Sequence, residues 1–417
     1  MSSAPRHGAV GHECRPGAGA RGSAGAGGPD GRRRGRATAA AFFAIVAPMP
    51  SPLPDAVDLA SVRRVLVTKL RHHGDVLLAS PVFTALRRAA PHAEIDALVY
   101  RETAPMLAGH PAIADLHTID RDWKRQGVLA QFRAERGLHA TLRARRYDLI
   151  VHLTEHPRGA TLARTLKPRY AVARERPGAS RWWARSFTHL YRQPLATPRH
   201  AVEANLDALR RLGVQPGEDD RRLVLVPGAA AEARADALLA QHGLQRGRFV
   251  QCHPGSRWLF KCWPAASTAA LLDRVAVDHA IVVTGAPDER ERALVAEVLA
   301  AIAPATRSRV VDLGGALTLP ELAALTSRAV AFVGVDSAPM HIAAAVGTPV
   351  VALFGPSGER EWGPWRVRAE VVASTRHACR PCGIDGCGGG KVSECLTTLP
   401  VERVHAAFLR VTGSAGA

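Results

Sequence analysis

The chain has 417 residues, which is enough for two or three domains of ordinary size. Hydrophobic residues make up 47% of it and there are only seven cysteines, so the composition excludes a fully disordered chain and a disulfide-stabilised scaffold. No apolar run reaches the roughly 18–20 residues of a membrane-spanning helix, so we expect no integral membrane protein.

The chain is strongly basic, with 55 Lys and Arg against 37 acids and a formal net charge of +18 at pH 7. Such a balance indicates an anionic partner, which can be nucleic acid, anionic lipid or a phosphorylated substrate. We find no basic patch interleaved with aromatic residues, so we expect no nucleic acid. Only five of the basic residues are lysines, which makes each lysine more informative than each arginine: Lys69, Lys124, Lys167, Lys261 and Lys391.

The first 40 residues are rich in Gly, Ala and Arg and contain no aromatic residue. Because such a segment cannot bury a core, we expect residues 1–60 to form a disordered extension. Three arginines at 32–34 followed by apolar residues 39–47 resemble a short export signal. We favour the alternative, an upstream extension with Met49 as the true start.

From residue 62 onward, short apolar runs alternate with helical patterns, which is typical of a parallel sheet buried on both faces. Helices are expected from Pro81 and over 124–145 and 200–212. The expected strands of this half are 62–70, 95–100, 116–119, 147–153 and 170–173.

The polar stretch 215–222 is typical of a linker, and the same alternation restarts after it. One large doubly wound sheet would explain the pattern, but two similar halves favour two Rossmann-like domains, 61–214 and 223–396, followed by a helix and tail over 397–417. The strands expected in the second half are 223–226, 249–252, 280–284, 310–313, 330–333 and 350–354. Helices are expected between them near 230–242, 264–276, 288–302, 319–327 and 337–346.

Ligands of such folds bind at the carboxyl ends of the strands, so the loops there are the candidate sites. The first is 69–75 (KLRHHGD), where Gly74 permits a tight turn or a close approach. Asp75 suits either a helix N-cap or a general base that accepts a hydroxyl proton. His72 and His73 are weaker candidates, because a histidine in a turn is often solvated.

The second loop, 253–264 (HPGSRWLFKCWP), places Lys261 among large apolar residues. A partly desolvated ammonium there suits a phosphate oxygen, and the alternative is a lysine that extends over an aromatic surface. In the third loop, 284–289 (TGAPDE), Asp288 suits either ribose hydroxyls or the cap of the next helix.

The fourth loop, within 332–349, leads from an apolar strand into a helix of small residues. Backbone N–H groups at such a helix start attract an anion. Ser337 and His341 lie beside them, and so does Asp336. The alternative treats Asp336 as an N-cap and His341 as a core residue.

Four cysteines gather in a Gly-rich segment and suit either a tetrahedral metal site or reduced structural thiols. We favour the thiols, because the spacing is irregular and no His completes a standard pattern. The four are Cys379, Cys382, Cys387 and Cys395.

Together these loops resemble glycosyltransferase family 9, the ADP-heptose heptosyltransferases of lipopolysaccharide core assembly. The resemblance covers about residues 62–410 and is closest to the heptosyltransferase III branch. It rests on the segments 69–78 (KLRHHGDVLL), 79–82 (ASPV), 336–341 (DSAPMH) and 347–356 (GTPVVALFGP).

The resemblance implies an α/β architecture of the GT-B type, with two Rossmann-like domains whose parallel sheets face a cleft. The first domain would bind the acceptor and the second the nucleotide sugar, and the final helix near 401–411 would return to the first domain. Asp75 matches the family's base and Lys261 its donor-phosphate lysine. The other implied donor-binding residues are Ser256, Gly285, Asp288, Asp336, Ser337 and His341, and the acceptor-side loop holds Arg71, His72, His73 and Gly74.

The implied reaction is inverting transfer of a heptose from ADP-L-glycero-D-manno-heptose to the inner core of lipopolysaccharide, with no metal and no further cofactor. The implied location is cytoplasmic, peripheral on the inner face of the inner membrane and in contact with its anionic surface. Two alternatives remain at this point. One is a nucleotide-sugar epimerase of the same fold, and the other is a non-catalytic module that binds a membrane surface.

Overall fold

The computed structural model describes residues 55–193 and 197–413. Most of the expected N-terminal extension therefore lies outside the described residues. Val57 is buried, and its N–H donates to the carbonyl of Leu212 at 3.0 Å. The folded part of the chain thus begins before the expected boundary at residue 60.

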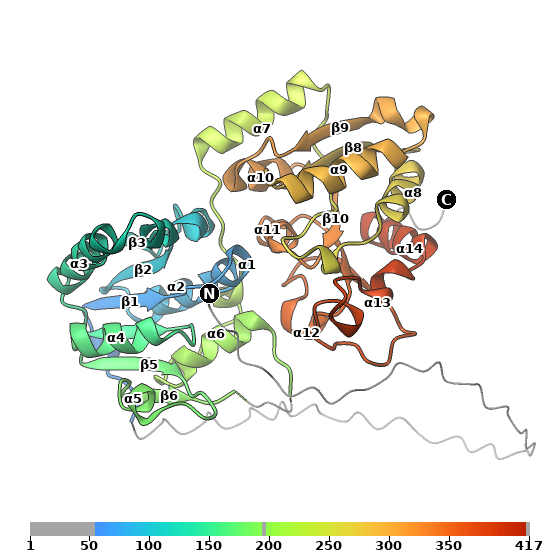
Figure 1. Ribbon diagram of the computed structural model, residues 1–417. Helices are drawn as coiled ribbons and strands as arrows, with labels where there is room; N and C mark the ends of the chain where they lie inside the picture. The colour runs from blue at the N-terminus through green and yellow to red at the C-terminus, as the bar shows by residue number, and fades with distance from the viewer. Residues whose placement is uncertain (1–54, 194–196, 414–417) are drawn as a thin grey trace, which may run out of the picture. The chain divides into compact units, whose positions relative to one another are not determined.

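The first half forms a six-stranded parallel sheet in the order β3-β2-β1-β4-β5-β6 (Figure 1). Helices α2 and α6 pack on one face of this sheet, and α3 and α4 pack on the other. The strands are β1 (Arg64–Thr68), β2 (Glu94–Tyr100), β3 (Asp115–Ile119), β4 (Leu149–His152), β5 (Tyr170–Arg174) and β6 (His189–Tyr191). The helices are α1 (His73–Leu77), α2 (Ser80–Ala89), α3 (Val128–Ala144), α4 (Pro157–Leu166), α5 (Arg181–Ala184) and α6 (Ala201–Arg210).

The second half repeats this plan with the order β12-β11-β10-β7-β8-β9. Helices α8, α9 and α14 cover one face, and α7, α10 and α11 cover the other. The strands are β7 (Phe249–His253), β8 (Ala280–Gly285), β9 (Val310–Gly314), β10 (Ala331–Val335), β11 (Val350–Phe354) and β12 (Ala369–Ala373). The helices are α7 (Ala229–Gln241), α8 (Ala265–Val275), α9 (Glu289–Ala301), α10 (Leu319–Thr326), α11 (Ala338–Ala345), α12 (Glu359–Trp362), α13 (Glu394–Thr397) and α14 (Val401–Thr412).

The predicted pair of parallel Rossmann-like sheets is confirmed. In each sheet the strand order reverses once, between β1 and β4 in the first and between β10 and β7 in the second. The loops that follow these four strands are therefore the ones that a doubly wound sheet opens for ligands. In the part of the chain that the structure describes, no helix is both long and apolar enough to cross a lipid bilayer.

The strand expected at 223–226 is absent from the structure, and that prediction is wrong. This segment connects the two halves and lies against the first one. Leu223 is buried in the core of the first half, and the N–H of Val224 donates to Ser80 Oγ at 3.0 Å. The apolar run therefore packs on the core and on the start of α2 instead of joining a sheet.

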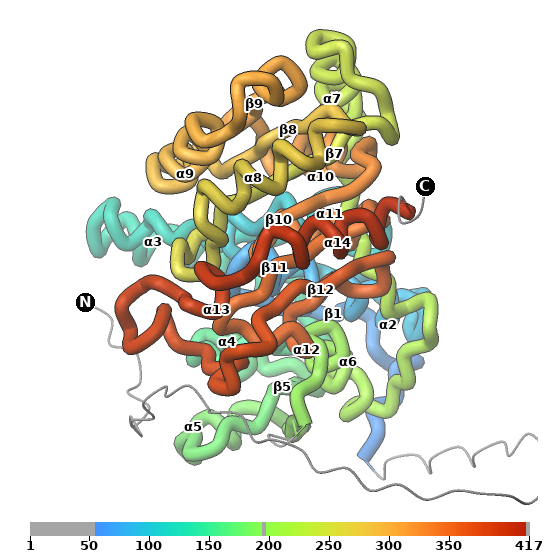
Figure 2. Tube along the Cα trace, turned by 90° about the vertical axis from the view of Figure 1, so that its right-hand side faces the viewer, coloured from blue at the N-terminus to red at the C-terminus, as the bar shows by residue number. Residues whose placement is uncertain are grey.

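The C-terminal helix α14 is confirmed, but it does not return to the first half as the resemblance implied. It lies against α8 and β12 in the second half (Figure 2). Its apolar residues Val404, Ala407, Phe408 and Val411 follow the i, i+3, i+4, i+7 pattern of one helix face and are buried in the core of the second sheet. Because this apolar face must be buried, the helix covers the second sheet.

A buried carboxylate joins neighbouring strands of the first sheet. Asp96 on β2 is fully buried and accepts hydrogen bonds from Arg145 Nε at 2.8 Å and from the Tyr147 hydroxyl at 2.7 Å. Burial alone raises the pKa of Asp96, but hydrogen bonds from His117, Arg145 and Tyr147 outweigh it and lower the pKa to about 2. The charged form is therefore the one that stabilises the fold.

We expect Asp96→Asn to lower the free energy of unfolding by about 2–4 kcal/mol at neutral pH, because it removes the buried negative charge that accepts from Arg145 and Tyr147. Because the pKa of Asp96 is lowered in the folded chain, its carboxylate stabilises the fold fully at pH values above about 4, the ordinary pKa of Asp. This stabilisation is lost as the pH falls through about 2. Urea unfolding at several pH values measures both effects, with Glu297→Gln, an exposed residue of α9, as the control. Equal destabilisation at pH 7 and at the acid end would contradict this assignment.

Candidate active site

The candidate site lies at the two places where strand order reverses. An open cavity of about 620 Å³ lies at the carboxyl ends of the first-sheet strands, and its lining includes the loops that follow β1 and β4. Charged side chains line it from several elements: Lys69, Arg71, Asp75, Glu155, Arg174, Arg199 and Glu361. A cavity of this size and polarity suits a sugar or a phosphorylated group.

Asp75 lies in the first turn of α1 and faces this cavity. The N-cap of the helix is His72, so Asp75 does not cap it. Among the described residues its one ionic partner is Arg71, with Nε 3.7 Å from Asp75 Oδ1. The carboxylate is therefore available to accept a proton from a group bound in the cavity.

Lys69 brings a positive charge to the same cavity, and the sequence analysis did not single it out as a site residue. Its ammonium donates to the carbonyl of Leu153 at 3.1 Å and to Asn205 Oδ1 at 2.9 Å. Burial lowers the pKa of Lys69 to about 8, and the nearby charge of Asp75 opposes that shift. The rarity of lysine in this chain was the one signal that pointed to it.

The loops of the two halves meet where α1 packs against α11. A Cβ added at Gly74 would lie 2.8 Å from His341 Cδ2, so only glycine fits there without a shift. His341 is buried, which lowers the pKa of its imidazole to about 4, and its Nδ1 has no hydrogen-bond partner in the described part of the chain. The predicted acceptor-side and donor-side residues Gly74 and His341 are thus in contact.

The predicted donor loops also come together. Lys261 Nζ lies 2.6 Å from Asp336 Oδ2, and the Asp336 side chain is mostly buried. Ser337 is the N-cap residue of α11, but its side chain makes no capping hydrogen bond, and its hydroxyl donates to the carbonyl of Val335 at 3.3 Å. Pro339 has no N–H in the first turn of α11, so this helix start offers fewer backbone donors than most.

The first turn of α9, which follows the loop after β8, contains an acid that the sequence analysis missed, Glu291. Asp288 Oδ1 accepts from the N–H groups of Arg290 and Glu291, which is the capping geometry weighed as the alternative to ribose binding. Glu291 is buried and accepts from Ala286 N at 2.9 Å. Burial raises the pKa of Glu291, but its hydrogen bond with His253 outweighs this effect and lowers the pKa.

Glu291 thus ties the loop after β8, which follows Gly285, to the loop after β7. A Cβ at Gly255 in the latter loop would lie 2.5 Å from Glu291 Oε2. The adjacent Ser256 is buried, and its Oγ lies 3.4 Å from the N–H of Trp258.

His72 and His73 are not among the residues that line the 620 Å³ cavity. Arg257 Nη1 donates to His72 Nδ1 at 2.9 Å, and burial together with the Arg257 charge lowers the pKa of His72. His73 Nε2 donates to the carbonyl of Glu102 at 2.8 Å. Both imidazoles therefore hold the loop to its neighbours.

The family model of glycosyltransferase family 9 (heptosyltransferase) matches residues 136–392. The chain belongs to this family. A lipopolysaccharide heptosyltransferase 3 from Escherichia coli is 37% identical over 299 residues, which cover 71% of this chain and 84% of the relative.

Solved structures agree on the fold. The glycosyl transferase family 9 structure from Veillonella parvula has a TM-score of 0.72 at 23% identity and covers 87% of this chain and 100% of that one. E. coli heptosyltransferase WaaC with ADP has a TM-score of 0.63 at 20% identity, over 84% of this chain and 99% of that one. The predicted GT-B fold and the family resemblance are confirmed.

The cysteine segment of this family 9 chain lies apart from these loops in the sequence. Cys395 is buried, and desolvation raises the pKa of its thiol to about 11, with smaller contributions from Cys379, Cys382 and Cys387. Within residues 55–193 and 197–413, no group of three or more His, Cys, Asp or Glu is placed to hold a metal ion. The expectation of a reaction without metal stays a prediction.

We expect Gly74→Ala to lower stability by about 1–3 kcal/mol and to reduce activity, because its methyl group displaces the His341 ring at the contact of the two loops. Gly137→Ala is the matched control, since that glycine lies inside α3 with open space around it and should become about 0.5–1 kcal/mol more stable. Thermal unfolding measures both variants. If Gly74→Ala proved as stable as Gly137→Ala, the contact with His341 would not be tight.

Proposed function

We propose that this chain transfers a heptose from ADP-L-glycero-D-manno-heptose to the inner core of lipopolysaccharide, with inversion at the anomeric carbon. Membership of glycosyltransferase family 9 and the similarity to a lipopolysaccharide heptosyltransferase 3 support this function. The observation that carries it is the carboxylate of Asp75, which faces an open cavity, does not cap its helix, and has Arg71 at 3.7 Å as its one ionic partner among the described residues.

On the acceptor side, Asp75 takes the proton of the attacking hydroxyl as its oxygen forms the new bond to the heptose anomeric carbon. The bond from that carbon to the phosphate oxygen breaks, and ADP leaves with the electron pair. Lys69, Arg71, Arg174 and Arg199 on the cavity lining provide positive charge for a phosphorylated acceptor.

On the donor side, Lys261 binds the diphosphate and stabilises the charge that develops on the leaving ADP. Because a carboxylate repels phosphate, Asp336 acts here by holding the Lys261 ammonium in place at 2.6 Å. Ser337 and the neutral His341 complete the diphosphate loop, while Ser256, Gly285 and Asp288 lie on the loops assigned to the nucleotide. That WaaC has been solved with ADP supports a nucleoside diphosphate at this site.

Neither a metal nor a further cofactor has a part in this scheme, because Lys261 supplies the positive charge on the leaving group. We place the protein in the cytoplasm, peripheral on the inner face of the inner membrane. The reasons are that the proposed acceptor is anchored in lipid and that the chain has a net charge of +18.

The function is tested by incubating the purified chain with ADP-heptose and defined truncated core acceptors, with product masses and ADP release as readouts. Transfer requires both substrates. Conversion of ADP-heptose in the absence of any acceptor would instead identify a nucleotide-sugar epimerase.

We expect Asp75→Ala to reduce transfer by about 10²–10⁴-fold while leaving the Kd for ADP unchanged, because a general base acts on the acceptor and not on the donor. Asp58→Ala is the control, since Asp58 caps a short helix away from the cavity. Steady-state rates and calorimetry measure the two quantities. Near-normal turnover in folded Asp75→Ala would refute the assignment.

We expect Lys261→Ala to weaken ADP binding about ten- to a hundredfold, the value of one charge-assisted contact. Lys261→Arg should restore only part of the affinity, because a planar guanidinium fits a point-charge site poorly. Lys391→Ala provides the matched lysine control, since Lys391 pairs with Asp385 at 2.7 Å in the exposed Gly-rich segment. Calorimetry with ADP is the measurement, and unchanged affinity in Lys261→Ala would move the diphosphate elsewhere.

A further inference from the structure

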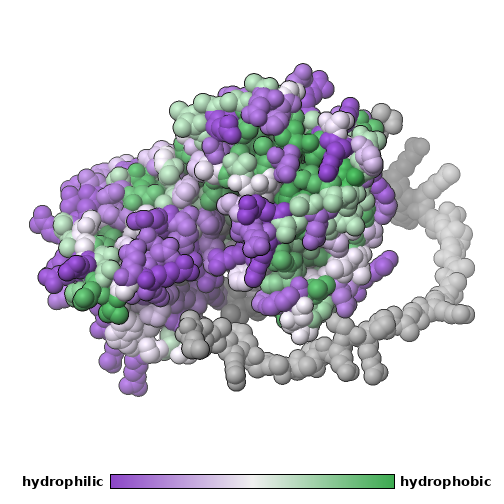
Figure 3. Space-filling model, turned by 45° about the horizontal axis from the view of Figure 1, so that its top comes forward, coloured by the Kyte–Doolittle hydropathy of each residue, from purple (hydrophilic) through white to green (hydrophobic). Residues whose placement is uncertain are grey.

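Helix α3 differs from the other long helices of the first half, because only Leu142 of its 17 residues is buried. Its N-terminal turns expose Val128 by 84%, Leu129 by 76% and Phe132 by 61%. The i, i+1, i+4 spacing places the three side chains on one side of the helix. Figure 3 shows hydrophobic surface beside hydrophilic surface at its left-hand end, the side on which α3 lies in Figure 1.

Positive charge surrounds these apolar side chains. Residues 121–146 contain eight Lys and Arg and only two acids. Both acids are paired, Asp122 with Arg125 at 3.3 Å and Glu135 with Arg158 at 2.6 Å. By contrast, three exposed basic residues next to the apolar turns form no ion pair with any described residue: Lys124, Arg133 and Arg136.

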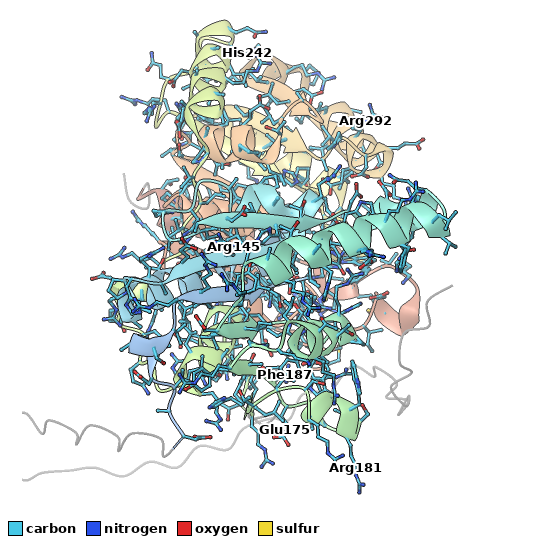
Figure 4. The ribbon with its side chains drawn as sticks, turned by 90° about the vertical axis from the view of Figure 1, so that its left-hand side faces the viewer. Arg145, Glu175, Arg181, Phe187, His242 and Arg292 are labelled. Carbon is cyan, nitrogen blue, oxygen red and sulfur yellow. The ribbon has the colours of Figure 1, made fainter. Side chains whose placement is uncertain are left out.

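The exposed end of α3 lies next to the acceptor cavity. A second cavity of about 260 Å³ is lined by Lys124 and by Gln131 of α3. His156 lines both this cavity and the larger one that contains Asp75. In Figure 4, α3 crosses the face turned toward the viewer and has its C-terminal end near the labelled Arg145, so the apolar turns are at the opposite end of the helix.

We propose that Val128, Leu129 and Phe132, together with Lys124, Arg133 and Arg136, form a surface that docks on an anionic lipid bilayer. The apolar side chains enter the headgroup region while the basic side chains bind lipid phosphates. The biological reason for docking rests on the proposed function, since an acceptor anchored in lipid must reach the cavity that adjoins this α3 surface.

The composition of the α3 surface favours lipid over protein partners. Three apolar side chains bury far less area than a stable protein interface, which needs about 1,000 Å² or more. In addition, a second copy of this chain would oppose the unpaired bases with identical charges, which is unfavourable. An anionic bilayer meets both features, because it accepts shallow apolar insertion and attracts each exposed base.

The test is co-sedimentation of the full chain with phosphatidylcholine vesicles that contain or lack phosphatidylglycerol. We expect binding to the anionic vesicles and a loss of about tenfold or more for the triple variant Val128→Ser, Leu129→Ser, Phe132→Ser. The double variant Arg133→Glu, Arg136→Glu should lose at least about fivefold per position. Because every variant keeps the same arginine-rich residues before residue 55, the differences report on α3.

Matched controls are available elsewhere in the chain. Val277→Ser removes an apolar side chain that is 71% exposed, and Arg234→Glu with Arg403→Glu reverses two exposed charges of the second half. None of these control variants should change vesicle binding by more than about twofold. Salt screens the interaction of the bilayer with charges that lie outside the α3 surface. Thermal unfolding checks that each variant is folded.

Unchanged vesicle binding in the triple variant, or no binding by the unmodified chain, would overturn the proposal. So would a dimer in solution that the triple variant abolishes, because the surface would then bind a second copy.

Measurements of transfer activity distinguish the proposal of lipid docking from the proposal of heptose transfer. With a short soluble acceptor the triple variant should keep its turnover, whereas with the acceptor embedded in vesicles it should be slower. Failure of the unmodified chain on the soluble acceptor would refute heptose transfer and leave the lipid result standing.

Discussion

In a doubly wound sheet, the helices that follow the two central strands lie on opposite faces, so the loops at that point diverge and leave a crevice. This constraint acts twice in the chain, between β1 and β4 and between β10 and β7. The polar residues of the candidate site follow these strands: Lys69 and Asp75 come after β1, Lys261 after β7 and Asp336 after β10. Each thus follows a buried strand that fixes its backbone, and polar partners hold its side chain in place: Asn205 for Lys69, Arg71 for Asp75, and Lys261 and Asp336 for each other.

The contact between α1 and α11 joins these two crevices. Gly74 lies against the ring of His341, which burial keeps neutral near pH 7. Burial lowers the pKa of His341, and the charges of Asp336 and Asp75 oppose that shift. A small residue and an uncharged ring thus form the contact between the loop that carries Asp75 and the loop that carries Asp336.

Much of this architecture can be predicted from the sequence, because continuous apolar runs bounded by turns identify buried parallel strands. The exceptions have physical causes. The run 223–226 is apolar because it packs on the first core, and β6 has only three residues and thus no readable pattern. Lys261 and Asp336 were both predicted as donor-side residues because both follow central strands, but their ion pair is visible only in the structure. Glu291 was missed, because its burial depends on a loop that is distant in sequence.

The net charge of +18 indicates an anionic partner without identifying it, and the geometry separates three kinds of anion. Lys261 is a single, mostly buried ammonium held by a carboxylate, which suits one diphosphate. Lys69 shares an open cavity with arginines, which suits a phosphorylated sugar. Arg133 and Arg136 lie exposed beside apolar side chains on a helix, where a surface and not a small molecule meets them. Equal charges therefore differ in function according to how deeply the fold buries them and what it places beside them.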